Sequence, residues 1–298
     1  MNKLVKLAFI IACTTVLAAC TKVIQIDVPN GSTMLVVDAF LDNDADTQKV
    51  RLTTTANYFN NSPTPAVTGA TVTLQDLTAS KTYTLTDDRH GNYYHVGSVS
   101  NDTMMKRGHD YKLNISYNGN TYYATSTVHR TIALIDSIAF RSSQTDVEDK
   151  YPNDTTKPRK FYPMIIAFDS TGTDYYWQKM YKNGVFYHQP RQLNTYQDIG
   201  ALNSDGGLLF FSVSFFQIIP ESDPIHRNDT CMVKILSVNK DTYNFLIQLQ
   251  TQLTNAQSGL FAVTPQNVKT NIKQTSGTLP AIGWFNTGLV KSKSRVAK

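Results

Sequence analysis

The residues best suited to chemistry are scattered along this sequence. Asp42, Asp44 and Asp46 alternate as the oxygen ligands of a calcium loop do, because hard cations prefer clustered carboxylates. Thr47 stands where an EF-hand loop has its glycine, and Thr53 stands where it has its bidentate glutamate. The three aspartates are therefore candidate metal ligands, and an acidic turn between strands is the competing interpretation. We predict no metal and no dissociable cofactor.

Other catalytic signatures are missing from the sequence. His90 and His95 lie five residues apart in a strand-like segment, which places their rings on opposite faces of a sheet. There is no Gly-x-Ser-x-Gly elbow, His-Glu-x-x-His motif, phosphate-binding glycine loop or dinucleotide fingerprint. Cys231 sits in an apolar run, where a cysteine is usually a small buried hydrophobe. We therefore expect a protein that is not an enzyme.

Adjacent aromatic residues are the remaining hint of a binding site. They occur at Tyr58-Phe59, Tyr93-Tyr94, Tyr122-Tyr123 and Tyr175-Tyr176-Trp177. Neighbours in a strand point to opposite faces, so each group should turn one ring toward the core and one outward. The candidate ligand-binding residues are Tyr94, Tyr123, Tyr176 and Trp177, which could stack on an oligosaccharide, a peptide or a partner. Ordinary sheet surface is the alternative, because tyrosine favours strands.

The first residues have the pattern of an export signal. Lys3 and Lys6 precede an apolar run from Leu7 to Leu17, which is too short to span a bilayer as a helix. Leu17-Ala18-Ala19-Cys20 resembles the lipobox of bacterial lipoproteins. We expect residues 1–19 to be a signal peptide and Cys20 to carry a diacylglyceryl group and an N-acyl chain such as palmitate. Several acyl chains give stable anchoring, where one chain binds only marginally.

The net charge of +5 comes from the two ends of the chain. Lys3, Lys6 and the four cations of residues 291–298 account for it, which leaves the body near −1. A nearly neutral body argues against a nucleic-acid-binding surface. We expect residues 291–298 to form a basic, solvated tail.

Most of the exported part has the two-residue hydrophobic period of strands. Six or seven short strands in residues 33–130 predict an immunoglobulin-like β-sandwich after a lipid-anchored linker at 20–32. Residues 131–290 predict a second β-rich domain. Asn118-Gly119 and Asn183-Gly184 predict two tight hairpins, the second of which should place Tyr181 opposite Phe186.

One segment has helical spacing. Phe245, Leu246, Leu249 and Leu253 recur along one face, and Asp241 is the expected N-cap. The sequence therefore predicts a mainly β protein with one amphipathic helix near its C-terminal end.

Several segments together resemble a family of Bacteroidetes lipoproteins known as domain of unknown function family 4249. They are Val23–Pro29, Leu35–Leu41, Val67–Val72, Asp241-Thr242-Tyr243, Pro265–Ile272 and Ile282-Gly283-Trp284-Phe285. Trp284 departs from the tyrosine that the family has in its last motif. The resemblance implies a location in the cell envelope. It also implies that the gene lies beside genes for TonB-dependent outer-membrane transporters. It implies no activity and no catalytic residues.

The expected function is therefore that of an accessory or binding lipoprotein beside a TonB-dependent nutrient transporter. A structural or adhesive cell-surface protein is the alternative. Thr21, rather than aspartate, follows Cys20, which favours the outer membrane. No acidic run follows the cysteine, which favours the periplasmic face over the cell surface.

Overall fold

The computed structural model describes residues 31–44, 47–56, 62–96, 104–130, 134–142, 161–187, 193–197, 207–212, 223–255 and 266–298. The chain divides into two units, and every strand and helix considered below belongs to the second unit, Thr33–Ala56 with Ser62–Lys298. The expected signal segment, Cys20, Asp46 and the Tyr58-Phe59 pair lie outside the described residues.

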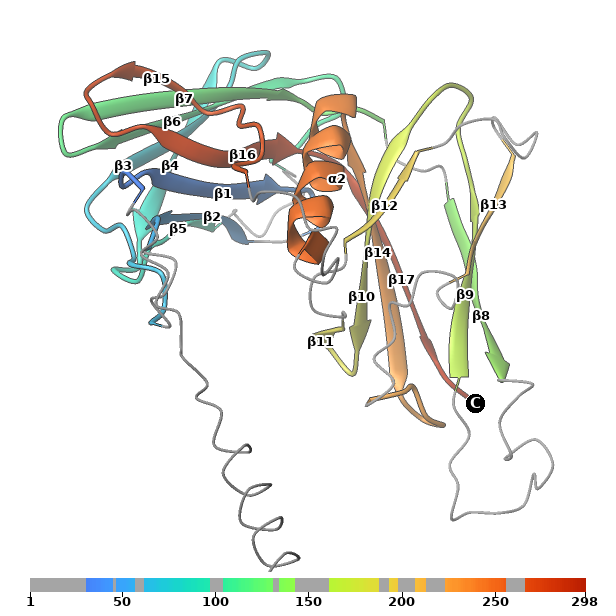
Figure 1. Ribbon diagram of the computed structural model, residues 1–298. Coiled ribbons are helices and arrows are strands. Elements are labelled where there is room, and N and C mark those ends of the chain that lie inside the picture. The colour runs from blue at the N-terminus through green and yellow to red at the C-terminus, as the bar shows by residue number, and fades with distance from the viewer. Residues whose placement is uncertain are drawn as a thin grey trace, which may run out of the picture. The chain divides into compact units, whose positions relative to one another are not determined.

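A nine-stranded sheet forms the first part of this unit (Figure 1). In spatial order its strands are β15 (Lys273–Ser276), β7 (Asn120–Thr127), β6 (Asp110–Tyr117), β3 (Thr71–Asp76), β4 (Lys81–Asp87), β5 (Asn92–Val96), β2 (Thr47–Thr54), β1 (Leu35–Leu41) and β16 (Ala281–Thr287). The first part of β4 pairs with β3, and its last two residues pair with β5. The sheet bends there and nearly closes on itself, since the Thr287 N–H donates to Ser126 Oγ of β7 at 2.9 Å.

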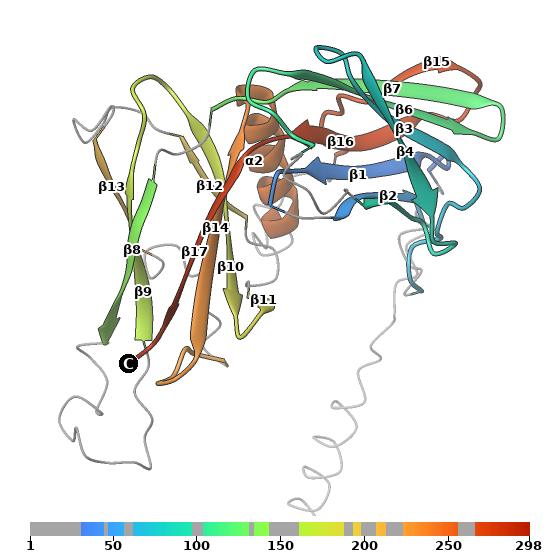
Figure 2. The same cartoon turned by 180° about the vertical axis from the view of Figure 1, so that it is seen from behind.

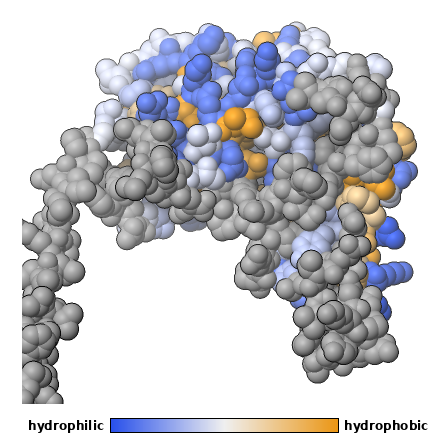
Figure 3. All heavy atoms as spheres, turned by 45° about the vertical axis from the view of Figure 1, so that its right-hand side comes forward, coloured by the Kyte–Doolittle hydropathy of each residue, from blue (hydrophilic) through white to orange (hydrophobic). Residues whose placement is uncertain are grey.

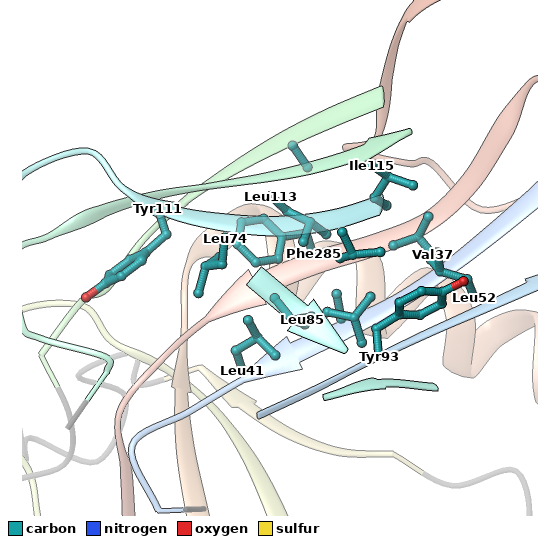
Figure 4. Packing of buried hydrophobic residues seen from close by; sticks show 14 of the residues in the cluster. Val37, Leu41, Leu52, Leu74, Leu85, Tyr93, Tyr111, Leu113, Ile115 and Phe285 are labelled. Atoms are coloured by element: carbon teal, nitrogen blue, oxygen red, sulfur yellow. The ribbon is translucent and has the colours of Figure 1, made fainter. Parts of the chain in front are cut away.

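Alternating residues fill the interior of this folded sheet (Figure 4). In β1, for example, Leu35, Val37, Ala39 and Leu41 are buried, while the residues between them face outward. Each fully buried side chain of this size stabilises the fold by about 1.5–3 kcal/mol. The predicted alternation of the N-terminal strands therefore produces one continuous core.

Two smaller sheets form the second part (Figures 1 and 2). The five-stranded sheet contains β11 (Val185–Tyr187), β10 (Tyr175–Lys182), β14 (Thr230–Val238) and β17 (Val290–Val296), with β12 (Asn194–Gln197) also pairing with β10. The three-stranded sheet contains β13 (Leu208–Ser212), β9 (Phe161–Phe168) and β8 (Leu134–Ser142). Their facing sides share a second core, which includes Ile138, Ile165, Met180, Cys231 and Val233.

Both predicted hairpins are confirmed. Asn118 and Gly119 have φ values of 46° and 74°, and Asn183 and Gly184 have values of 51° and 81°. Asparagine and glycine adopt this left-handed region at little steric cost, which is what a two-residue turn needs.

The predicted cross-strand pair at the second hairpin is also confirmed. Tyr181 pairs with Phe186, and their ring centroids are 5.4 Å apart.

The C-terminal segment is divided between the two parts, which differs from the expected boundary at residue 130. β16 pairs in parallel with β1, and β15 pairs with β7, although both strands fall in the predicted second domain. Their pairing with strands far away in sequence leaves no local signal that could have assigned them correctly.

The expected basic tail is wrong as a description of residues 291–298. Residues from Val290 to Val296 form β17, which pairs with β14, and the flanking Ala297 is fully buried. Lys293 Nζ donates to the Asp136 carbonyl at 2.6 Å, and Arg295 Nη1 donates to the Ile138 carbonyl at 2.6 Å. Two of the cations thus bridge to β8, because long basic side chains can satisfy the carbonyls of a strand at the edge of its sheet.

The mainly β architecture with one helix near the C-terminal end is confirmed over the described residues. The helix, α2 (Lys240–Asn255), is too short and too polar to cross a membrane, and no other described helix could do so. Its N-cap is Asn239 rather than the expected Asp241, since Asn239 Oδ1 accepts the Thr242 N–H at 2.7 Å. Both residue types cap helices well, so the sequence alone could not separate two candidates two positions apart.

Candidate functional site

An apolar groove of about 450 Å³ lies where α2 meets β1, β16 and β10. Figures 1 and 2 both show α2 at the junction between the nine-stranded sheet and the strands β10, β12 and β14. The groove falls within the size range of small-molecule sites. Its lining consists of Val36, Val37, Asp38, Phe40, Trp177, Leu193, Phe245, Leu246, Leu249, Gln252, Gln266, Asn267, Val268, Ile282, Gly283 and Trp284.

The sheet wall of the groove follows from the register of two strands. β1 buries every second residue in the core, so Val36, Asp38 and Phe40 face the other way. β16 runs parallel to β1, with Ile282 beside Val36 and Trp284 beside Asp38. The outer faces of the two strands thus form one continuous surface that can receive the helix.

Gly283 permits this close pairing. Its φ is +107°, and a Cβ added there would lie 2.0 Å from the Val37 carbonyl oxygen. Glycine can adopt this conformation without a side-chain clash. The backbone of β16 can therefore approach β1 closely where both strands line the groove.

The helix wall follows from helical spacing. Phe245, Leu246, Leu249 and Gln252 lie on one face of α2 and all line the groove. Phe245 stacks on Trp284 with ring centroids 4.6 Å apart and an interplanar angle of 17°. Such pairs stabilise by about 0.5–1.5 kcal/mol beyond the area that they bury.

A buried relay fixes the start of α2 on β16. Trp284 Nε1–H donates to Thr242 Oγ1 at 2.9 Å, and the Thr242 hydroxyl donates to Asn286 Oδ1 at 2.9 Å. Thr242 and Asn286 are fully buried. The indole of Trp284 is therefore held in one orientation against the groove.

The segment before β15 holds the free edge of β16. Thr270 Oγ1 donates to the Gly283 carbonyl at 2.7 Å. Asn271 bonds both to the Phe285 carbonyl, at 2.7 Å, and to the Phe285 N–H, at 2.9 Å. Residues 266–272 and Ile282–Phe285, which belong to two of the segments that carry the family resemblance, thus meet at this wall.

The wall contributed by the five-stranded sheet is aromatic. The ring of Phe40 packs edge-on against Trp177 of β10, with centroids 5.0 Å apart. Lys179, two residues further along β10, places Nζ 4.0 Å from the centroid of the Trp177 ring. Asp38 is the only ionisable residue in the described lining of the groove, so the site offers contact surface rather than an acid–base pair.

The four aromatic candidates lie in four different places. Trp177 lines the groove. Tyr94 is partly buried on β5, and Tyr123 is partly buried on β7 with Lys112 Nζ 4.9 Å from its ring centroid. No described contact joins these three residues.

Tyr176 is wrong as an outward-facing candidate. Only 1% of it is exposed, and its hydroxyl donates to Asp169 at 2.7 Å. Burial, followed by the bond to Asp169, raises the pKa of this phenol. Alternation predicts that neighbours in Tyr175-Tyr176-Trp177 diverge, but only tertiary packing decides which of them faces the core.

The aspartate candidates make local structural contacts. Asp42 Oδ1 accepts the Asp44 N–H at 2.9 Å, and Asp44 forms an ion pair with Lys234. Asp46 lies outside the described residues. Over the part of the chain that the structure describes, no three His, Cys, Asp or Glu side chains are grouped so that they could hold a metal.

Cys231 is a buried free thiol, as predicted. Its burial raises its pKa to about 12, so the reactive thiolate is scarce at neutral pH.

Sequence reasoning missed most of the groove. Its residues come from six segments between positions 36 and 284. The spacing in α2 and the aromatic run at Trp177 gave a signal for two of them, and the family resemblance marked three others without assigning them a role.

A family model described as "Domain of unknown function (DUF4249)" matches residues 21–294. The chain belongs to this family. No curated protein is significantly similar to it. Among solved structures, a match titled "Crystal structure of tetra-tandem repeat in extending region of large adhesion protein" has 15% sequence identity and a TM-score of 0.20. The match covers 70% of this chain and 46% of that one, so the chain spans less than half the length of that protein.

Proposed function

We propose that this member of the family is a non-enzymatic binding lipoprotein, whose groove beneath α2 holds an apolar ligand. The observation that carries the proposal is the composition of the groove, in which two tryptophans and several aliphatic side chains surround a preformed space of about 450 Å³. Small-molecule sites are typically concave and mostly apolar, with a few polar groups that set orientation. Gln252, Gln266 and Asn267 supply such groups here.

The proposed setting is the outer membrane, with the chain anchored through lipid on Cys20 and acting beside a TonB-dependent transporter. The lipobox-like sequence Leu17–Cys20 supports the anchor. The gene neighbourhood that the family resemblance implies supports a TonB-dependent transporter as the partner. The periplasmic face is the proposed side, because no acidic run follows the cysteine.

Site-specific photocrosslinking in intact cells tests the partner. One variant carries the crosslinking residue at Gln266, on the groove, and a matched variant carries it at Thr82, an exposed position on β4. The proposal predicts that a TonB-dependent transporter is captured from position 266 and not from position 82. If no transporter were captured from either position, the proposal that a TonB-dependent transporter is the partner would be contradicted.

A further inference from the structure

Lys179 lies outside the lining of the groove but next to one of its walls, in an unusual environment for an ammonium group. Its side chain is partly buried, and Nζ lies over the ring of Trp177, one wall of the groove. Lys234 is its direct cross-strand neighbour on β14, so two like charges lie opposite each other. Like charges in this position destabilise a sheet unless they are compensated.

The two lysines are compensated differently. Lys234 forms an ion pair with Asp44. Lys179 has no carboxylate within 4.0 Å among the described residues, and its neighbour is the face of an indole. Burial lowers the pKa of Lys179, against the opposing influence of Asp42 and Asp38. A partly desolvated cation without an ion-pair partner gains the most from an anion that arrives beside it.

We propose that the groove takes a single-chain amphiphile with an anionic head, whose apolar chain packs against Trp177 and Trp284 and whose head binds Lys179. This inference rests on the proposed ligand-binding function and names the chemical class of its ligand. The aromatic and aliphatic lining suits the chain, and the ammonium group over Trp177 suits the head.

Asp38 restricts the charge of that head. Its carboxylate is exposed on the same groove, where it repels negative charge that is not held close to Lys179. A monoanion such as a carboxylate is therefore a better ligand than a dianionic phosphate ester. The ligand class is a fatty-acid-like monoanion.

The two tryptophans make the site measurable. The chain contains only Trp177 and Trp284, and both line the groove, so intrinsic tryptophan fluorescence reports on this place alone. The full chain is titrated with dodecanoate, dodecan-1-ol and dodecylammonium, each below its micelle concentration. We expect dodecanoate to bind about tenfold more tightly than the alcohol, as for one added charge-assisted contact, and dodecylammonium to bind least.

Chain length tests the apolar part of the site. Each methylene buried contributes about 0.8 kcal/mol, so affinity should rise about fourfold for each carbon from decanoate to dodecanoate. Adsorption of the head alone on a surface cation would give no such dependence.

Variants at Lys179 test the head. Lys179→Met should weaken dodecanoate binding about tenfold and leave dodecan-1-ol unchanged, whereas Lys179→Arg should preserve both. The matched control is Lys112→Met, since Lys112 also lies over an aromatic ring, that of Tyr123, but on the distant strand β6. Asp38→Asn should tighten dodecanoate binding.

The outcomes separate this inference from the proposed function. Equal affinities for alcohol and carboxylate, unchanged by Lys179→Met, would overturn the anionic head and leave an apolar groove in place. No fluorescence change with any of the three ligands would instead contradict ligand binding in the groove itself.

Discussion

At the scale of single residues, Thr242 connects the helix to the sheet at the groove. Its hydroxyl accepts from Trp284 and donates to Asn286, and all three side chains are buried. Thr242→Val keeps the shape but leaves an indole N–H and an amide oxygen without a partner. We expect the free energy of unfolding to fall by about 3 kcal/mol, since each buried unpaired group costs about 1–3 kcal/mol.

Urea unfolding of both proteins measures this change. Thr251→Val is the control, because the Thr251 hydroxyl donates to the Ile247 carbonyl on the exposed side of the same helix. The control should change the free energy by less than about 0.5 kcal/mol. Equal effects of the two substitutions would refute the role of the relay.

Asp76 is the residue from which we expect acid sensitivity. Burial opposes its ionisation, but hydrogen bonds from the Ala79 N–H and from His109, at 2.8 Å, outweigh burial and lower its pKa. The unfolded chain therefore takes up the proton first as pH falls. The stabilisation is complete above the unfolded value, near 3.8, and is lost as pH falls through the lower native value.

Thermal unfolding midpoints between pH 5 and pH 2 test this assignment. The wild type should lose stability below about pH 4, and Asp76→Asn should show a shallower acid dependence from a lower starting point. Asp241→Asn, at an exposed position on α2, is the matched control substitution. If the unfolding midpoint of Asp76→Asn depended on pH as that of the wild type does, other carboxylates would be responsible for the loss of stability in acid.

At the scale of elements, the pairing of β1 with β16 creates the sheet wall of the groove. Gly283→Ala places a methyl group against the Val37 carbonyl in a left-handed backbone conformation. Strain and overpacking together should lower the free energy of unfolding by roughly 4 kcal/mol.

Gly184→Ala is the matched control for Gly283. Its φ is also positive, but nothing lies within 4 Å of an added Cβ. We expect the free energy of unfolding to fall by about 1–2 kcal/mol, from the backbone conformation alone. Denaturant midpoints measure both variants, and equal losses would show that close strand approach is not what Gly283 provides.

Elements with local signals could be predicted from the sequence. The Asn183-Gly184 turn fixes its own hairpin, and the spacing of Phe245, Leu246 and Leu249 fixes the helix. The partners of β16 and β17 could not be predicted, because each pairs with a strand far away along the chain. Periodicity specifies which face is buried and says nothing of which strand lies beside it.

The same limit applies to the site. Trp177 was a candidate because it ends an aromatic run, but nothing near it in sequence points to Trp284 or Phe40. Tyr176 was equally aromatic and is buried in the second core. Trp177 and Tyr176 are neighbours in one strand and so face opposite sides of the sheet. Packing between the sheets decides which of the two sides is buried.

At the scale of the whole described unit, the groove is the place where its parts meet. Segments 36–40 and 282–284 come from the nine-stranded sheet, Trp177 comes from the five-stranded sheet, and α2 lies against both. On the face drawn in Figure 3, hydrophilic residues dominate and hydrophobic residues form only small separate spots.

Native mass spectrometry of the intact protein, released gently from the membranes of its host, tests most directly that this groove holds a ligand. The comparison is between the wild type, Leu249→Trp, which fills the groove, and Ile247→Trp, which places the same ring on the exposed side of α2. We predict a small added mass on the wild type and on Ile247→Trp, and its loss from Leu249→Trp. The same added mass on all three proteins, or none on the wild type, would contradict a ligand site beneath α2.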